Sequence, residues 1–247
     1  MSGHSKWASI KHKKGAADQR RGQIFSRLVK EISVAAKHGG GSVDANPRLR
    51  LALQRAKEAN MPQDNIERAM KRGTGELPGV TYEELTYEGY GPGGIAILVE
   101  CLTDNKKRTA SDVRTVFDKR HGSMGGAGSV AWQFHKKGYI LVSKSAADED
   151  RVMSVALDAG AQDLQIEGDS YEITTESHDM EKVKKALEAV GIPMVSAEIT
   201  LIPTSTVRVK GQQARDVLAL VEALEDLEDV QNVYTNFDIP DEELQVS

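Results

Sequence analysis

Residues 139–201 contain six apolar segments whose order restricts the fold more than any other feature of the chain. Four segments have the alternating or continuous apolar character of strands, and two have the three-and-four spacing of amphipathic helices. Strands are predicted at 139–142, 163–166, 171–174 and 195–201, and helices at 148–159 and 180–190. This β-α-β-β-α-β order is that of the ferredoxin-like fold.

Three short amphipathic helices are predicted before this unit. Apolar residues from Ile24 to Ala36 follow helical spacing and end at a glycine run. A second helix starts at Asn46-Pro47, where Asn can cap free N–H groups and Pro suits the first turn. Met61-Pro62 ends it, and a third helix extends to Gly73. These segments predict a small helical bundle.

The remaining segments are expected to form one more sheet. Strands are predicted at 85–90, 95–102 and 130–134, with a helix at about 107–120; beyond Pro203 a strand at 206–209, a helix at 212–227 and a strand at 230–237 follow. The later segments are too few for a sheet of their own, so we expect them to complete the sheet begun by residues 80–135. Residues 139–201 would then be an insertion.

The predicted fold class is therefore α+β. An N-terminal three-helix domain with a basic arm precedes a ferredoxin-like-type α/β domain, which is interrupted by a second ferredoxin-like β-α-β-β-α-β domain. The expected boundaries are 1–20 for an extended arm, 21–76 for the helical domain, 77–135 plus 203–240 for the middle domain, and 136–202 for the inserted domain.

Charge is distributed unevenly along the chain. The net charge is −5, but residues 1–75 carry 16 Lys and Arg against 6 Asp and Glu, whereas the rest of the chain carries 16 against 31. A basic N-terminal region joined to an acidic body is typical of a protein that binds a polyanion, and nucleic acid is the expected partner.

The candidate nucleic-acid-binding residues follow from this asymmetry. Clustered lysines in the arm can release counterions from phosphates, and Trp7 can stack on a base. A solvated tail explains the charges but not the Trp. A basic cluster that begins the helix near residue 107 is a second candidate, although cations oppose the dipole there and Asp104 and Asp112 can neutralise them. The full set is Lys6, Trp7, Lys11, His12, Lys13, Lys14, Arg20, Arg21, Arg27, Lys30, Arg48, Arg50, Arg55, Lys106, Lys107 and Arg108.

Other function classes lack support in the sequence. The six histidines are scattered, and Cys101 is the only cysteine, so we expect no catalytic site, metal or cofactor. The glycine clusters at 91–94 and 125–128 do not precede a helix as phosphate-binding loops do. No apolar run reaches the ~18 residues of a membrane span, and no signal peptide is apparent. We expect a cytoplasmic protein that does not bind membranes.

Several segments resemble the YebC/PmpR family, to which the mitochondrial translational activator of cytochrome oxidase subunit one also belongs. They are residues 3–14 (GHSKWASIKHKK), 46–50 (NPRLR), 60–62 (NMP), 87–94 (YEGYGPGG) and 103–105 (TDN). The resemblance covers essentially the whole chain. It implies three domains, an N-terminal helical domain followed by two α/β domains, and a role in gene expression.

Three functions remain open at this point. The resemblance implies either a DNA-binding transcriptional regulator or a translation factor that acts at the ribosome. A flexible arm with Lys, His and Trp suits irregular rRNA, whereas the basic helices also suit DNA. A small-molecule enzyme on the ferredoxin-like domains is the remote third alternative, because no titratable cluster supports it. The sequence does not indicate the oligomeric state.

Overall fold

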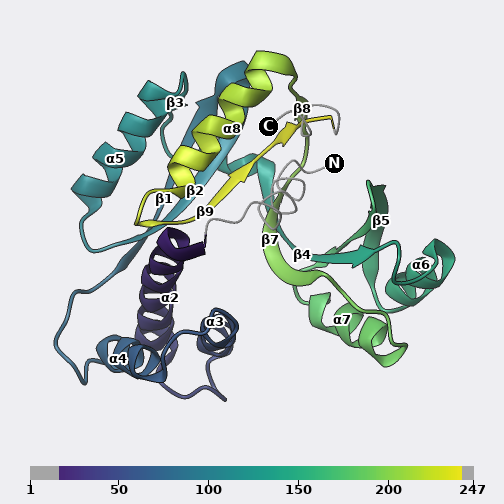
Figure 1. Ribbon diagram of the computed structural model, residues 1–247, viewed down its shortest axis with the longest axis horizontal. Coiled ribbons are helices and arrows are strands. Elements are labelled where there is room, and N and C mark those ends of the chain that lie inside the picture. Colours follow the sequence, from purple (N-terminus) through teal and green to yellow (C-terminus); the bar gives the residue numbers. More distant parts are fainter. Residues whose placement is uncertain (1–16, 241–247) are drawn as a thin grey trace. The chain divides into compact units, whose positions relative to one another are not determined.

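A computed structural model describes residues 17–240, with side chains described from residue 22 onward. Contacts between Cα atoms divide these residues into two units, shown in Figure 1. One unit comprises residues 17–131 and 210–235, and the other comprises residues 132–209 and 236–240. None of the described helices is both long and apolar enough to cross a bilayer.

The first unit begins with a bundle of three helices. They are α2 (Ala17–Gly39), α3 (Pro47–Glu58) and α4 (Gln63–Thr74). Their apolar stripes meet in one core that includes Ile32, Leu49 and Ile66. Helices α2 and α4 approach closely because position 73 is glycine, where a Cβ atom would lie 2.3 Å from the carbonyl oxygen of Ser33. The predicted helical bundle is confirmed.

An antiparallel sheet forms the rest of the first unit. Its strands are β1 (Glu83–Gly91), β2 (Ile95–Thr103), β3 (Ser123–Met124) and β9 (Val230–Thr235), in the order β3-β1-β2-β9. A 3₁₀ turn, η1 (Pro92–Gly94), joins β1 to β2. Helices α5 (Lys106–Lys119) and α8 (Gly211–Glu225) pack on this sheet (Figure 1). Glycine at position 89 makes room for α5, since a Cβ there would lie 2.7 Å from the Phe117 ring.

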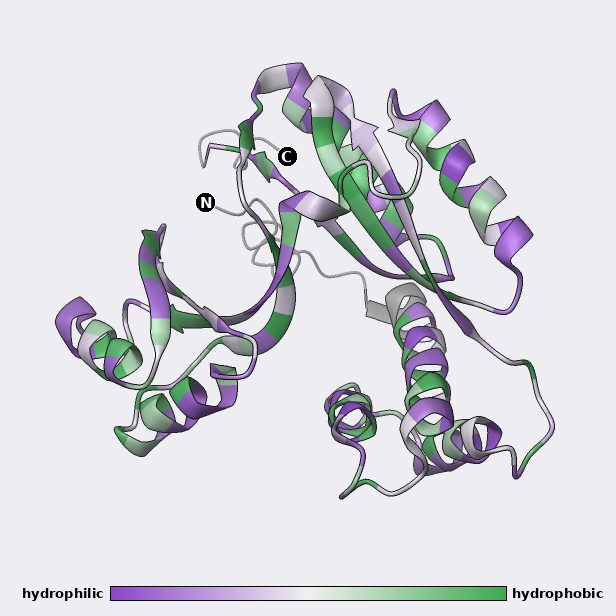
Figure 2. Cartoon of the chain, turned by 180° about the vertical axis from the view of Figure 1, so that it is seen from behind, coloured by the Kyte–Doolittle hydropathy of each residue, from purple (hydrophilic) through white to green (hydrophobic). Residues whose placement is uncertain are grey.

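The second unit contains a ferredoxin-like arrangement. It comprises β4 (Phe134–Ser143), α6 (Glu149–Asp158), β5 (Ala161–Glu167), β6 (Ser170–Glu176), α7 (Met180–Ala189) and β7 (Ser196–Pro203). The sheet order β5-β6-β4-β7 follows directly from the predicted β-α-β-β-α-β pattern. Its core joins strand residues such as Ile140 and Ile173 to Val152 of α6 and Leu187 of α7. Figure 2 shows hydrophobic residues on both the strands and the helices of this unit.

The structure corrects two predicted strands. Residues 130–134 are not a strand, because residues Ala131–Gln133 form the 3₁₀ turn η2 and β4 begins only at Phe134. The backbone N–H groups of Val130 and Ala131 donate to the Glu88 carboxylate, at 2.7 and 2.8 Å, so they are not available to a strand ladder.

The predicted strand at 206–209 also does not complete the sheet of the first unit. Only β8 (Val207–Arg208) is extended, and it pairs in parallel with β10 (Phe237–Asp238) in a separate two-stranded ladder. The final predicted strand is therefore divided at Asn236. Its first part, β9, pairs with β2 as expected. The predicted α+β class is confirmed.

Candidate nucleic-acid interface

Part of the candidate set cannot be placed. Lys6, Trp7, Lys11, His12, Lys13 and Lys14 lie outside the described residues. Arg20 and Arg21 belong to α2, whose side chains are described only from residue 22 onward. The structure therefore describes the side-chain contacts of the candidates from Arg27 to Arg108 only.

The two α2 candidates that can be placed point toward the sheet of their own unit. Lys30 is 5% exposed, and its Nζ atom lies 2.6 Å from Asp229 Oδ1 and 3.1 Å from the Glu228 carbonyl oxygen. Arg27 donates to the carbonyl oxygen of Glu225. Burial lowers the pKa of the Arg27 guanidinium, against the opposing effect of nearby carboxylates. These cations attach α2 to the loop between α8 and β9, and Lys30 is too buried to contact a phosphate.

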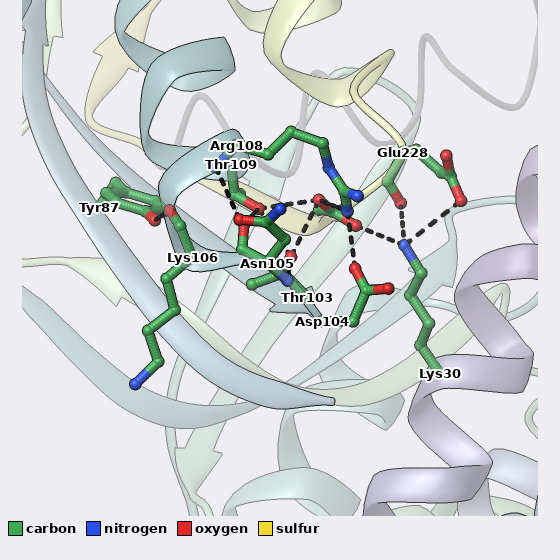
Figure 3. Close-up of polar contacts among 10 residues, drawn as sticks. Lys30, Tyr87, Thr103, Asp104, Asn105, Lys106, Arg108, Thr109 and Glu228 are labelled. Carbon is green, nitrogen blue, oxygen red and sulfur yellow. Dashed lines mark hydrogen bonds and ion pairs between the residues drawn. The ribbon is translucent and has the colours of Figure 1, made fainter. Parts of the chain in front are cut away.

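Asp229 organises a group of side chains that we call the Asp229 cluster: Lys30, Thr103, Arg108, Thr109 and Asp229 (Figure 3). Its carboxylate accepts from Arg108 at 2.8 Å, Thr109 at 2.8 Å and Thr103 at 3.1 Å. Burial acts to raise the pKa of Asp229, but the donors outweigh it and hold that pKa at about 2. The cluster joins α2, the start of α5 and the start of β9.

The start of α5 is already neutralised by carboxylates. Lys106 Nζ lies 2.5 Å from Glu83, and Arg108 bridges Asp104 at 2.9 Å as well as Asp229. Asn105 caps the helix by accepting from the backbone N–H of Arg108. Lys107 is exposed. Because two of the three cations here are paired within the chain, this cluster is a weaker phosphate site than its sequence indicates.

The three candidate arginines of α3 differ in the ion pairs and hydrogen bonds that they form within the chain. Arg48 forms a bidentate pair with Glu31, with nitrogen–oxygen distances of 2.8 and 3.2 Å, and also donates to Glu84. The hydrogen bonds to Glu31 are the largest cause of a raised pKa for Arg48. Arg50 donates to backbone carbonyl oxygens of the preceding loop, and Arg55 is exposed. Arg50 and Arg55 are thus the more accessible candidates.

The bundle exposes further cations that the sequence analysis did not select. Apart from Arg48, which is paired with Glu31 and Glu84, we call the exposed basic residues of α3 and α4 the α3–α4 cations: Arg50, Arg55, Lys57, Arg68, Lys71 and Arg72. Residues 68, 71 and 72 are three and four positions apart, so helical spacing alone would have placed them on one side of α4. Six cations on these two consecutive helices, which both pack on α2, can attract a phosphate chain without any specific chemistry.

Metal-binding groups and the single cysteine can both be assessed among the residues that the structure describes. They contain no group of His, Cys, Asp and Glu side chains able to hold a metal ion. The Cys101 thiol is buried, and burial together with the Asp229 charge raises its pKa to about 12, so it is not a reactive thiolate at neutral pH.

The fold and the exposed cations of the bundle define a class of protein: an α+β protein of two units, one of which begins with a basic three-helix bundle. Family models described as the TACO1/YebC N-terminal domain and the TACO1/YebC second and third domain match residues 5–76 and 82–237. The chain belongs to the TACO1/YebC family.

Several relatives are similar over nearly their whole length. A probable transcriptional regulatory protein of Desulforapulum autotrophicum is 58% identical over 242 residues, which cover 98% of each chain. A protein of the same description from Dictyoglomus thermophilum is 58% identical over 246 residues, 99% of each chain. The crystal structure of a conserved hypothetical protein from Aquifex aeolicus matches with a TM-score of 0.83 at 46% identity, covering 96% of this chain and 98% of that one.

Proposed function

We propose that this protein is a non-enzymatic regulator of gene expression that binds DNA through its first 75 residues. The observation that carries the proposal is the segregation of charge, with 16 Lys and Arg against 6 Asp and Glu in that region. The regulatory names of its relatives support the same class of function.

Binding would combine two kinds of contact. The arm lysines and the α3–α4 cations neutralise phosphates and release counterions, which supplies affinity for any sequence. Trp7 adds a stacking surface for an exposed base. Lys30 is excluded from this interface by its burial, and Arg48 and Arg108 contribute less because carboxylates already pair with them.

The salt dependence of binding tests the arm directly. Replacing Lys11, Lys13 and Lys14 with Ala should reduce the slope of log K against log[salt] by about 2.7, because each phosphate contact contributes about 0.9 on duplex DNA. The matched control replaces three lysines of α7, Lys182, Lys184 and Lys185, and should leave the slope unchanged. An identical slope for the arm variant and the wild type would exclude phosphate contacts by these lysines.

Sequence selectivity requires a separate comparison. A promoter duplex and a random duplex of the same length are titrated in competition at physiological salt. A regulator that recognises a sequence should prefer its site by at least about 10³-fold. Equal competition would remove sequence-selective DNA binding from the proposal while leaving non-specific binding intact.

A second candidate function is binding to ribosomal RNA as a translation factor. The exposed side of α4 carries Asp64 in its first turn and Glu67 a turn later. Recognition helices read base edges with their N-terminal residues, and carboxylates there are repelled by phosphates. Such a bundle suits backbone contacts to an irregular RNA better than a major groove. Co-sedimentation with ribosomal subunits at moderate salt tests this function, and its absence would count against it.

A further inference from the structure

The sheet of the first unit meets the helical bundle at a pocket of about 130 Å³. Residues of α2, α3 and the strands β1, β2 and β9 line it, and all of them belong to this unit. On the strands, the register aligns Thr86 with Glu100 and Glu100 with Asn232. Gly89 faces the Phe117 ring of α5, and side chains alternate along a strand, so these three residues point the other way. The pocket therefore lies on the sheet face away from α5.

One wall of the pocket carries a hydrogen-bond donor without an acceptor. The side-chain nitrogen Nε2 of Gln231 is buried, and among the described residues no atom accepts from it. The register passes from the pair Glu100–Asn232 to the pair Cys101–Val230, so Gln231 is the extra residue of a β-bulge, a feature that redirects a side chain. The last torsion of a Gln side chain has broad minima, so the amide can turn toward a ligand. Because an unpaired buried donor is costly, the pocket favours a ligand that supplies an acceptor.

Glu100 offers an acceptor in the same pocket. Its Oε2 atom accepts from Asn232 Nδ2 at 3.0 Å and from the Tyr234 hydroxyl at 3.1 Å. Both donors are neutral, and no lysine or arginine of the described residues pairs with this carboxylate. Its other oxygen, Oε1, can accept from a ligand. The pocket thus suits a ligand that carries a donor and an acceptor side by side.

A pyrimidine base has the size and the polar edge that these groups require. A cavity of about 150 Å³ holds a benzene molecule, so about 130 Å³ matches one six-membered ring better than the two rings of a purine. Cytosine has an amino group that donates to carboxylates, next to acceptors for an amide N–H. Uracil and thymine have an N–H group between two carbonyl oxygens. An alkylammonium ion has donors only, and the described residues contain no group that could hold a metal ion.

Helix α3 brings cations to the same place. Arg48 lines the pocket and pairs with Glu31 and Glu84, so these two carboxylates are already neutralised. Arg50 and Lys57 of the same helix are exposed. The 12 residues of α3 span about 18 Å, which is the length of several nucleotides of a single strand. A strand with one base in the pocket can therefore place neighbouring phosphates near the cations of α3.

We propose that this pocket binds one unpaired pyrimidine base of a nucleic-acid strand. Glu100 accepts from the base, Gln231 donates to it, and cations of α3 attract the flanking phosphates. The inference rests on the proposed function in one respect, because it assigns a base-binding site to a protein that holds the strand through its phosphates. A paired base in a duplex hides this edge, so the site requires a single-stranded or extruded base.

Strands of equal charge test base recognition in the intact protein. A short strand carries abasic sugars except for one central C, T or A, and a fully abasic strand is the reference. At physiological salt the protein should bind the C and T strands about tenfold more tightly than the A and abasic strands, the discrimination expected from one good pair of hydrogen bonds to a base. Equal binding of all four strands would overturn the proposal. DNA and RNA versions of the strands identify which nucleic acid supplies the base.

Two variants locate the recognition in the pocket. Glu100→Gln removes the carboxylate, and Gln231→Met removes the unpaired amide at similar volume. Each should abolish the preference for the C and T strands and leave the affinity for the abasic strand unchanged. Glu222→Gln, exposed on α8, is the matched control and should keep the preference. A preference that survives in both pocket variants would mean that the base binds elsewhere.

The stability of Gln231→Met distinguishes a binding residue from a structural one. The substitution deletes a buried donor that has no acceptor, so it should not lower the free energy of unfolding in urea. A clear loss of stability would show that the amide serves the fold, and the donor on which the proposal depends would be removed.

Free nucleosides separate failure of this inference from failure of the proposed function. They carry no phosphate, so they bind without help from the cationic helices. Millimolar cytidine should shift the NMR signal of the Gln231 side-chain amide, which is assigned by its absence in Gln231→Met, and adenosine should shift it several-fold less. If cytidine shifts the signal and no strand binds, the proposed function fails and the pocket assignment stands. If strands bind but cytidine leaves the signal unchanged, the pocket assignment is refuted and the proposed function stands.

Discussion

Asp229 makes the burial of Lys30 possible. A buried ammonium group is tolerated only when a carboxylate and other acceptors surround it, and Asp229 lies 2.6 Å away with the Glu228 carbonyl oxygen at 3.1 Å. The position of Lys30 in a basic helix predicts a phosphate-binding cation. Its partner is 199 residues further along the chain, so no local pattern could have indicated the pair.

Removing the carboxylate of Asp229 should therefore destabilise the first unit. Asp229→Asn leaves the buried Lys30 charge with only the exposed Glu228 carboxylate, 3.6 Å away, as its anion, and we expect the free energy of unfolding to fall by about 3 kcal/mol. Urea unfolding at pH 7 measures this loss. The exposed Glu222→Gln should change that free energy by less than about 0.5 kcal/mol. A loss as small as the control's would show that the Asp229 cluster does not stabilise the fold.

The same residue predicts how stability depends on pH. Its folded pKa of about 2 lies below the value of ~3.9 expected in the unfolded chain. Its contribution is therefore present above the unfolded pKa and is lost as the pH falls through the folded pKa. Between pH 4 and 2 the wild type should lose more stability than Asp229→Asn does. Parallel pH profiles for the two proteins would contradict this assignment.

Glu88 fixes the loop that leads into the second unit. Its carboxylate accepts from the backbone N–H groups of Gly128, Val130 and Ala131 at 2.6 to 2.8 Å. Burial acts to raise the pKa of Glu88, but these donors outweigh it and lower that pKa. Glu88→Gln replaces one acceptor oxygen with a donor, which should cost about 1 to 3 kcal/mol. Hydrogen exchange at these three amides should accelerate, whereas unchanged protection would contradict the role.

At the scale of the elements, the helices and the ferredoxin-like order were predictable because local signals specify them. The expected helix start at Asn46-Pro47 is confirmed, with Pro47 in the first turn and the Asn46 side chain accepting from the Leu49 N–H group at 3.0 Å. The hairpin between β5 and β6 turns at Gly168, whose φ of 51° favours glycine.

The predictions that were wrong or lacking concern segments whose structure depends on residues far away in the sequence. Residues 130–134 have strand composition, but Glu88, about 40 positions earlier, takes the N–H groups that a strand would need. β3 is only two residues long and exists through its pairing with β1. The same holds for the candidate site. Helical spacing predicts which of its cations are exposed, but it does not predict the ion pairs of Lys30, Arg48 and Lys106 with residues of other elements.

Asn46 should be the most sensitive cap in the bundle. Besides capping α3, its amide group donates to the carbonyl oxygens of Ala35 and Gly40, each at 2.8 Å, and so ties α3 to the end of α2. Asn46→Ala should lower the free energy of unfolding by about 2 kcal/mol or more. Asn46→Asp keeps the cap but places a carboxylate oxygen against these two carbonyl oxygens, so it should be at least as destabilising as Asn46→Ala in urea unfolding. A smaller loss for Asp than for Ala would show that the cap matters more than the donated bonds.

At the scale of the whole molecule, the ferredoxin-like sheet begins and ends on adjacent strands, which permits its removal from the chain. Phe134 at the start of β4 pairs with Pro203 at the end of β7, so the chain enters and leaves the ferredoxin-like sheet through adjacent strands. Paired residues of antiparallel strands lie about 5 Å apart. A linker of two to four glycines can therefore replace residues 135–202 without stretching the chain.

We expect this deletion variant to fold and to keep the Asp229 cluster, because every member of that cluster belongs to the first unit. It should unfold cooperatively in urea, and Asp229→Asn should destabilise it as much as it destabilises the full chain. A variant that does not unfold cooperatively, or whose stability Asp229→Asn leaves unchanged, would show that the first unit depends on residues 135–202 for its fold.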